Sequence, residues 1–108
     1  MRICFDLDET LCTGYPYVKA RPLPKAIEVV NSLKQKGHTI IIYTARRMGK
    51  YEGNIGKALK EVGKLTLDQL DCWGVQYDEI YFGKPSADYY VDDKAINACF
   101  IPEFLDIV

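Results

Sequence analysis

The stretch Ile3–Cys12 reads ICFDLDETLC, and its pattern decides how the rest of the chain is arranged. Arg2–Phe5 is a short apolar run that ends in acidic residues, which is typical of a buried parallel strand leading into a functional loop. Asp6 and Asp8 follow this strand together with Glu9, for which we expect a solvent or turn position. Carboxylates so close in sequence repel one another, so a positive group must compensate for them.

Strands and helices alternate along the rest of the chain. Apolar residues at helical spacing predict a helix over 24–36 that stops at Gly37. The β-branched run TIIIY over 39–43 predicts a second strand. The other expected elements are a helix capped by Asn54, a helical stretch over 67–73, a third strand before Pro85, a fourth strand DYYVDD over 88–93, and an apolar tail over 100–108 that docks on the core.

This order of elements predicts an α/β fold. We expect a Rossmann-like parallel sheet of about four strands, flanked by helices and connected by right-handed crossovers. A chain of 108 residues without repeats or linkers is expected to form a single domain, 1–108. In sheets of this kind, ligands bind beyond the carboxyl ends of the strands.

The composition, with 48% hydrophobic and 27% charged residues, is that of an ordinary soluble protein. A formal net charge of -1 gives no electrostatic reason to expect nucleic-acid binding. The N-terminal residues MRICFDLDE suit neither a signal peptide nor a membrane span, so we expect a cytoplasmic protein that does not bind membranes. The four cysteines lack C-x-x-C spacing, which favours reduced core thiols over a zinc site or disulfides.

Polar side chains follow each predicted strand at its carboxyl end. They are Asp6 and Asp8 after the first strand, Thr44 and Arg46 after the second, Lys84 after the third, and Asp92 and Asp93 after the fourth. Clustered carboxylates favour a hard divalent cation, and a set made only of oxygen ligands is typical of Mg²⁺. The ion, the Lys84 ammonium and the Thr44 hydroxyl would then form a cradle for a phosphoryl group.

Two of the acids suit covalent phosphoryl transfer. Asp6 can attack phosphorus and become an aspartyl-phosphate, while Asp8 can protonate the leaving oxygen and later activate water. At this point a family resemblance becomes clear. FDLDET, Thr44 in IIIYTAR, Lys84 in FGKP and the two acids of YYVDD resemble the four ordered motifs of the haloacid dehalogenase-like phosphohydrolases.

The resemblance extends from Asp6 to Asp93 and implies a Mg²⁺-dependent phosphohydrolase. By this resemblance Asp6 is the nucleophile and Asp8 the general acid and base, while Thr44 and Lys84 anchor the phosphate. The implied metal ligands are Asp6, Asp8 through its backbone carbonyl, and Asp92, with Asp93 next to them or bound through water.

A narrower resemblance concerns the loop TARRMGKYEGNIGK, residues 44–57. It is similar to the corresponding loop of the small capsular polysaccharide biosynthesis phosphatases. We therefore expect a small phosphorylated sugar as substrate, contacted by Arg46, Glu52 and Asn54. Helix capping also explains Asn54, and a solvated surface position also suits Arg46.

Enzymes of this family usually cover the active site with a cap domain inserted between motifs. Only 36 positions separate Asp8 from Thr44, and 40 separate Thr44 from Lys84. The expected loops, helices and strands fill both intervals, so neither has room for an inserted domain. The sequence therefore predicts a capless enzyme. Its selectivity must come from the loops over 13–22 and 47–53, or from a neighbouring subunit of a homo-oligomer.

Three other interpretations fit parts of the pattern. A phosphorelay receiver domain also combines acids, a Thr and a Lys-Pro. Its paired acids follow the first strand and its phosphoacceptor lies on a middle strand, whereas the paired acids of this chain come last. DLDETL, residues 6–11, resembles the capless protein phosphatases that act on the RNA polymerase C-terminal domain, which makes a phosphoprotein an alternative substrate. The domain could also be an inactive scaffold, although every expected catalytic position is filled.

Overall fold

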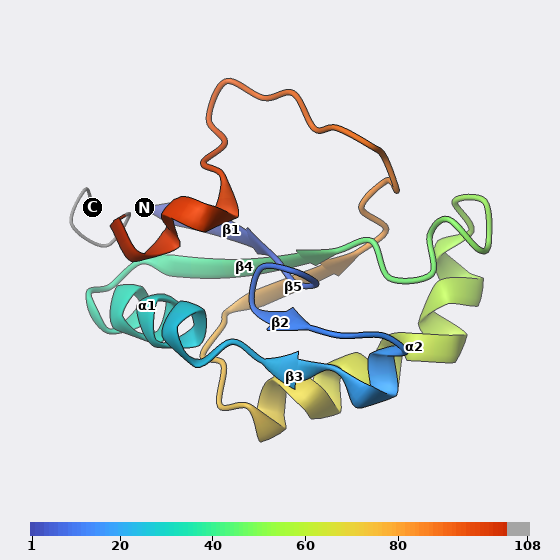
Figure 1. Cartoon of the computed structure of the whole chain (residues 1–108), viewed down its shortest axis with the longest axis horizontal. Coiled ribbons are helices and arrows are strands. Elements are labelled where there is room, and N and C mark those ends of the chain that lie inside the picture. Colours follow the sequence, from blue (N-terminus) through green and yellow to red (C-terminus); the bar gives the residue numbers. More distant parts are fainter. Residues whose placement is uncertain (104–108) are drawn as a thin grey trace.

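Figure 1 shows a computed structural model of the chain, which describes residues 1–103. Three parallel strands form the main sheet in the order β1-β4-β5. They are β1 (Arg2–Asp6), β4 (Thr39–Thr44) and β5 (Glu79–Phe82). A small antiparallel pair, β2 (Cys12–Thr13) and β3 (Arg21–Pro22), lies in the segment between β1 and the first helix.

Helices connect the three parallel strands. α1 (Pro24–Gln35) precedes β4, and α2 (Ile55–Cys72) connects β4 to β5. Two 3-10 turns, η1 (Tyr17–Lys19) and η2 (Ala98–Phe100), lie outside this sheet. α1 begins with a proline, whose fixed φ and missing N–H suit the first turn of a helix.

α2 is one continuous helix where the sequence predicted two helical stretches, so that prediction was wrong. Gly63 is a poor helix former and weakens the helical pattern at this point. Val62, Gly63 and Thr66 are nevertheless buried, and packing of this face outweighs the low propensity of the glycine.

The core lies between one face of the sheet and both helices. Phe5 and Ile42 are register partners on β1 and β4, and both belong to one buried cluster. Leu33 of α1 and Leu70 of α2 belong to the same cluster, so the two helices cover the same face. Each fully buried leucine contributes about 1.5–3 kcal/mol through the hydrophobic effect.

The α/β class, with a parallel sheet flanked by helices, is confirmed, and no cap domain is inserted within residues 1–103. The fourth strand predicted over 88–93 is not formed. Residues 83–97, which we call the arch, run from β5 to η2 without regular structure and stand away from the sheet and helices (Figure 1). Only residues 83–87 separate β5 from the predicted strand, whereas a parallel crossover needs about a dozen residues.

The chain after the arch returns to the body of the protein. Ile101 is buried and joins the core, while Phe100 is exposed. The rest of the expected docking tail, residues 104–108, lies outside the described residues. No helix in the part of the chain that the structure describes is long and apolar enough to cross a membrane.

All four cysteines are free thiols, but only Cys12 is buried. The expectation of core thiols was therefore wrong for Cys4, Cys72 and Cys99, which are exposed. Cys72 is the last residue of α2, and Cys99 lies in η2 at the end of the arch. Cys4 lies on β1 between residues that face the helices, so its own side chain faces the other way.

Candidate active site

The turn after β1 holds the first two candidate carboxylates. Leu7 lies between Asp6 and Asp8 and is fully buried. Its carbonyl accepts backbone N–H bonds from residues 10–12 at 2.8 to 3.3 Å. Glu9 has φ 59 and is exposed, as expected for a turn residue. Because Leu7 anchors the turn in the core, both flanking aspartates stay only partly covered at its surface.

The ends of β1, β4 and β5 lie side by side in the sheet. The Lys84 Nζ lies 3.4 Å from Asp6 Oδ1, and the Thr10 hydroxyl donates to Asp6 Oδ2 at 3.5 Å. The backbone N–H of Lys84 donates to the Thr44 carbonyl at 3.2 Å, which fixes the start of the arch against the end of β4. Gly83 makes this approach possible because its φ is 96 and a Cβ there would lie 2.7 Å from a methyl carbon of Ile55.

Asp8 is held by Arg46 from the end of β4. The Arg46 Nε donates to both carboxylate oxygens of Asp8, at 3.2 and 3.0 Å, and Nη2 donates to Oδ1 at 3.0 Å. The Arg46 side chain is fully buried, whereas that of Asp8 is 32% exposed. Arg46 therefore balances the negative charge of Asp8 from the interior of the protein, and the Asp8 carboxylate stays accessible from the surface.

Arg46 has no free face for a substrate. Its Nη1 donates to the Thr66 hydroxyl at 3.1 Å and to Gln69 Oε1 at 2.6 Å, and its guanidinium carbon lies 4.8 Å from the centre of the Tyr17 ring. The Nη2 also contacts the sulfur of Cys12 at 3.6 Å. The predicted contact between Arg46 and substrate was therefore wrong, because this side chain is 1% exposed and its donors are engaged inside the protein.

Thr44 and Cys12 complete the buried layer beneath the carboxylates. The Thr44 oxygen accepts the backbone N–H of Arg46 at 3.1 Å, which uses a lone pair and leaves the hydroxyl proton for donation. The Cys12 sulfur lies 3.5 Å from Asp8 Oδ1. Burial, and then the negative charge of Asp8, raise the pKa of the Cys12 thiol to about 12. Cys12 is therefore a neutral packing group and not a nucleophile.

The loop after β4 has a second, more exposed half. Asn54 caps α2, since its side-chain oxygen accepts the backbone N–H of Lys57 at 3.0 Å. The capping explanation of Asn54 thus has a direct structural basis, whereas its predicted substrate contact stays a prediction. Glu52 is exposed with φ 50, and its predicted substrate contact also stays a prediction.

A charged cluster connects this loop to the segment before η1. Arg47 forms an ion pair with Glu61 and donates to the Tyr15 hydroxyl at 3.0 Å. Lys50 and the Tyr51 hydroxyl also bond Glu61, at 2.7 and 2.8 Å. These hydrogen bonds, that of Lys50 first, lower the pKa of Glu61 from 4.5 to about 2. The cluster forms a polar rim next to Tyr17, whose ring also contacts Arg46.

The two remaining acids of the predicted site do not reach it. Asp92 and Asp93 are exposed in the arch, and the Asp92 carboxylate accepts the backbone N–H of Lys94 at 2.7 Å. Within residues 1–103, no group of three or more His, Cys, Asp or Glu side chains is placed to hold a metal ion. A single chain in this arrangement therefore does not fit the predicted Mg²⁺ ligand set, although Asp6 is open to a ligand.

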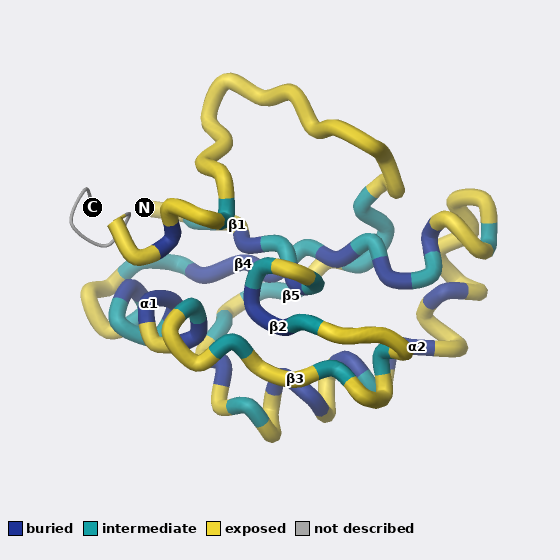
Figure 2. The backbone as a smooth tube through the Cα atoms, viewed as in Figure 1, coloured by how far each residue is buried: buried dark blue, intermediate teal, exposed yellow. Residues whose placement is uncertain are grey.

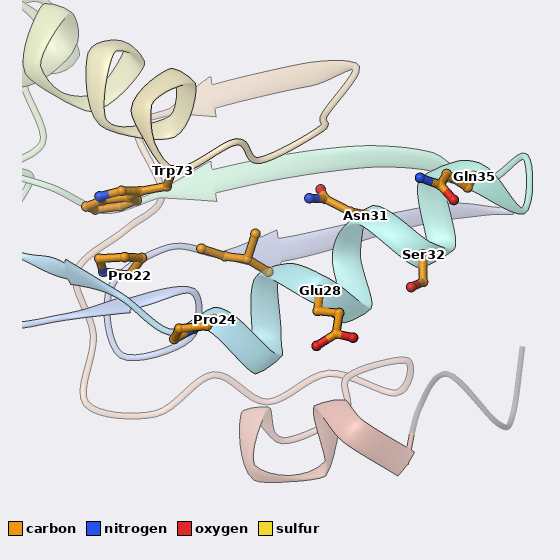
Figure 3. Close-up of a pocket in the computed structure, with 8 residues that line it drawn as sticks. Pro22, Pro24, Glu28, Asn31, Ser32, Gln35 and Trp73 are labelled. Carbon is orange, nitrogen blue, oxygen red and sulfur yellow. The ribbon is translucent and has the colours of Figure 1, made fainter.

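A surface pocket along α1 lies away from these residues. Figure 3 shows this pocket, which is lined by Pro22, by Trp73 and by residues of α1 that include Asn31. None of the candidate catalytic residues lines it. The chemistry is therefore expected at the open end of the sheet and not in this pocket.

Sequence reasoning missed two residues that bond Arg46. Thr66 and Gln69 lie on the buried face of α2, and the Gln69 amide also donates to the Tyr17 carbonyl at 2.6 Å. A signal was present, because two polar residues at i and i+3 lie beside Val62 and Leu70 on the apolar face. Buried polar groups need partners, so these two residues implied a buried charge nearby.

Comparisons with known proteins identify relatives of this chain. A sequence profile of the haloacid dehalogenase-like hydrolases matches residues 3–66, a match that contains Asp6, Asp8 and Thr44 and ends before Lys84. The chain belongs to this family. No protein of curated function matches its sequence.

This family member also resembles a solved structure. The crystal structure of a target protein from Vibrio cholerae superposes with a TM-score of 0.89 at 33% sequence identity. The similarity covers 98% of this chain and 94% of that one. That protein carries no functional name, so the likeness supports the fold and the family and says nothing about a substrate.

Proposed function

We propose that this hydrolase removes phosphate from a phosphomonoester through an aspartyl-phosphate on Asp6. The observation that carries the proposal is that Lys84 Nζ lies 3.4 Å from Asp6, while a second carboxyl two residues on, Asp8, is held by buried Arg46. A phosphoryl group between Asp6 and Lys84 would meet a nucleophile, a positive charge and a proton donor or acceptor.

In the first step Asp6 attacks phosphorus and a bond forms between its carboxylate oxygen and the phosphoryl group. The bond to the leaving oxygen breaks, and that oxygen keeps the electron pair. Asp8 supplies the proton that converts the leaving oxygen into a hydroxyl. Lys84 bonds the phosphoryl oxygens as negative charge builds on them. The contact predicted for the Thr44 hydroxyl stays a prediction, since Thr44 is 1% exposed.

In the second step water attacks the phosphorus of the aspartyl-phosphate. Asp8 takes a proton from this water, the bond to Asp6 breaks, and inorganic phosphate leaves with Asp6 restored. Arg46 holds the Asp8 carboxylate in place for both proton transfers, and the proton taken from water is the one that Asp8 supplies in the next turnover. Arg46 acts through Asp8 and is therefore a positioning residue.

The substrate class that we propose is a small phosphorylated sugar, of the kind used in polysaccharide biosynthesis. What supports it is the loop resemblance and the open polar rim, where Tyr15 is 69% exposed and bonded to Arg47. Aromatic rings beside charged groups suit sugar rings, which have both apolar faces and hydroxyls. Tyr15→Leu should weaken turnover of the sugar phosphate more than that of an aryl phosphate.

The proposal is tested by measuring phosphate release from an aryl phosphate and from panels of sugar phosphates, nucleotides and phosphopeptides, with Mg²⁺ present. Asp6→Asn should lower kcat by about 10³-fold or more while the fold is retained, because an amide is a poor nucleophile. Asp68→Asn is the matched control, since Asp68 is an exposed acid paired with Lys64 on α2. Equal rates for Asp6→Asn and wild type would reject the assignment, and a phosphopeptide as best substrate would reject the sugar phosphate.

A further inference from the structure

The Lys84 side chain needs a contact that fixes its direction. Its backbone N–H donates to the Thr44 carbonyl at 3.2 Å, but the ammonium lies at the end of a flexible four-carbon stem. The Nζ lies 3.4 Å from Asp6 Oδ1, which is longer than the roughly 2.7–2.9 Å of a charge-assisted hydrogen bond. Asp6 therefore attracts the ammonium without holding it tightly.

The ring of Tyr90 supplies a second contact from the arch. The Lys84 Nζ lies 4.2 Å from the centre of this ring. A cation within about 6 Å of an aromatic ring is attracted by the negative charge density of the ring face. The Tyr90 hydroxyl donates to the Pro85 carbonyl at 2.6 Å, which fixes the ring against the start of the arch. Ammonium and ring are thus held together within one short segment, 84–90.

Burial in the core does not account for the position of Tyr90. Its ring is 52% exposed, and every residue from 85 to 97 is exposed (Figure 2). A half-exposed ring outside the buried cluster adds little to the stability of the fold. Replacing Tyr90 should therefore act on the Lys84 ammonium and not on the packing of the sheet and helices.

We propose that Tyr90 is a positioning residue whose ring holds the Lys84 ammonium beside Asp6. An ammonium that is already in place loses less side-chain freedom when it bonds a phosphoryl group. Because the ring carries no formal charge, it holds the cation without neutralising it, and the charge stays available for the phosphoryl oxygens. The effect on turnover rests on the proposed function, whereas the contact between ring and ammonium does not.

The position of the ammonium is tested by NMR of the full chain with carbon-13-labelled lysine. The signal that is missing in Lys84→Met identifies Lys84, and the ring current of Tyr90 should displace its ε-methylene protons from the ordinary lysine range. Tyr90→Leu should return this signal to the ordinary range, whereas Tyr90→Phe should leave it displaced. Tyr89→Leu is the matched control, because Tyr89 is the neighbouring residue and is 88% exposed. The same Lys84 signal in wild type and Tyr90→Leu would overturn the proposal.

The effect on turnover is tested with an aryl phosphate. Tyr90→Leu should lower kcat/KM by about three- to tenfold, and Tyr90→Phe should restore most of this loss because it keeps the ring. Tyr89→Leu should keep the wild-type rate, and all three variants should have the wild-type midpoint in urea. Equal losses in Tyr90→Leu and Tyr90→Phe, or no loss in Tyr90→Leu, would overturn the role of the ring.

A double-mutant cycle shows whether Tyr90 acts through Lys84. In the Lys84→Met background the ammonium is gone, so Tyr90→Leu should change kcat/KM by less than about twofold. A loss as large as in the wild-type background would overturn the proposal. If wild type hydrolyses no phosphomonoester, the proposed function fails, and the NMR signal of Lys84 still decides whether Tyr90 holds the ammonium.

Discussion

Two segments leave the carboxyl edge of the sheet in opposite ways. Arg46 lies two residues beyond the end of β4 and Lys84 two residues beyond the end of β5, so both present a cation to the aspartates after β1. Arg46 is fully buried with its donors engaged, whereas Lys84 is 17% exposed and leads into the arch. Equivalent positions on neighbouring strands can thus serve as internal support or as a surface contact, depending on what lies beneath them.

The difference arises from the element that follows each strand. α2 passes beneath the end of β4 and supplies Thr66 and Gln69 to the Arg46 guanidinium. β5 leads directly into the arch and not into a helix, so the Lys84 ammonium contacts Asp6 and the ring of Tyr90, 4.2 Å away. We call the Arg46 side of the site, which is held by buried hydrogen bonds, the built half. The Lys84 side, which faces solvent, is the open half.

Replacing Arg46 should have the largest effect on stability. Arg46→Met removes one partner of a buried ion pair and leaves Asp8, Thr66 and Gln69 without their donor, so the free energy of unfolding should fall by about 3–5 kcal/mol. Urea denaturation measures this loss. Arg47→Met, at the next position but on the surface, should cost about 1 kcal/mol or less. Similar losses for the two arginines would remove the distinction between the built half and the open half.

Replacing Lys84 should affect turnover and not folding. Lys84→Met removes the cation that we assign to the phosphoryl oxygens, so kcat/KM should fall by about 10²–10³-fold. The free energy of unfolding should change by about 1 kcal/mol or less, because the pair with Asp6 is partly solvated. Lys64→Met on the exposed face of α2 is the control. A large loss of stability in Lys84→Met would show that this side is as tightly built as that of Arg46.

Asn54 sharpens the comparison within the loop after β4. Asn54→Ala removes the cap of α2 and should lower the free energy of unfolding by about 0.5–2 kcal/mol. Asn54→Ser retains a capping oxygen and should restore most of that loss. If Asn54→Ser restores the stability but not kcat/KM for the sugar phosphate, the amide also contacts substrate. If both variants keep full activity, the predicted substrate contact is wrong.

The smallest expected effect concerns the rim around Glu61. The pKa of Glu61 is lowered to about 2 in the folded protein. The stability that the ionised Glu61 carboxylate contributes is therefore present above pH 4.5 and is lost as the pH falls through about 2. Glu61→Gln should therefore have a lower Tm than wild type at neutral pH, and the difference should shrink between about pH 5 and pH 2. Thermal denaturation across this range tests it, and a constant difference would contradict the assignment of the shift to Glu61.

The sequence predicted the three parallel strands, the first helix and the places of Asp6, Asp8, Thr44 and Lys84 at strand ends, because periodicity and strand ends are local features. It did not predict the short pair β2 and β3. The burial of Arg46 could not be predicted in the same way, since it depends on α2 residues twenty and more positions away. The fourth strand was predicted from its composition alone. Its connection is too short for a parallel crossover, and this constraint was already visible in the spacing after Pro85.

The most direct test of the account is to trap the phosphorylated enzyme. Asp8→Asn should slow hydrolysis of the intermediate, so acid quenching during turnover of an aryl phosphate should leave a phosphoryl group on the tryptic peptide of residues 3–19. Mass spectrometry with fragmentation should assign it to Asp6, and the double variant Asp6→Asn, Asp8→Asn should show none. A phosphoryl group on another residue, or an equal amount in the double variant, would contradict the central claim that Asp6 is the nucleophile.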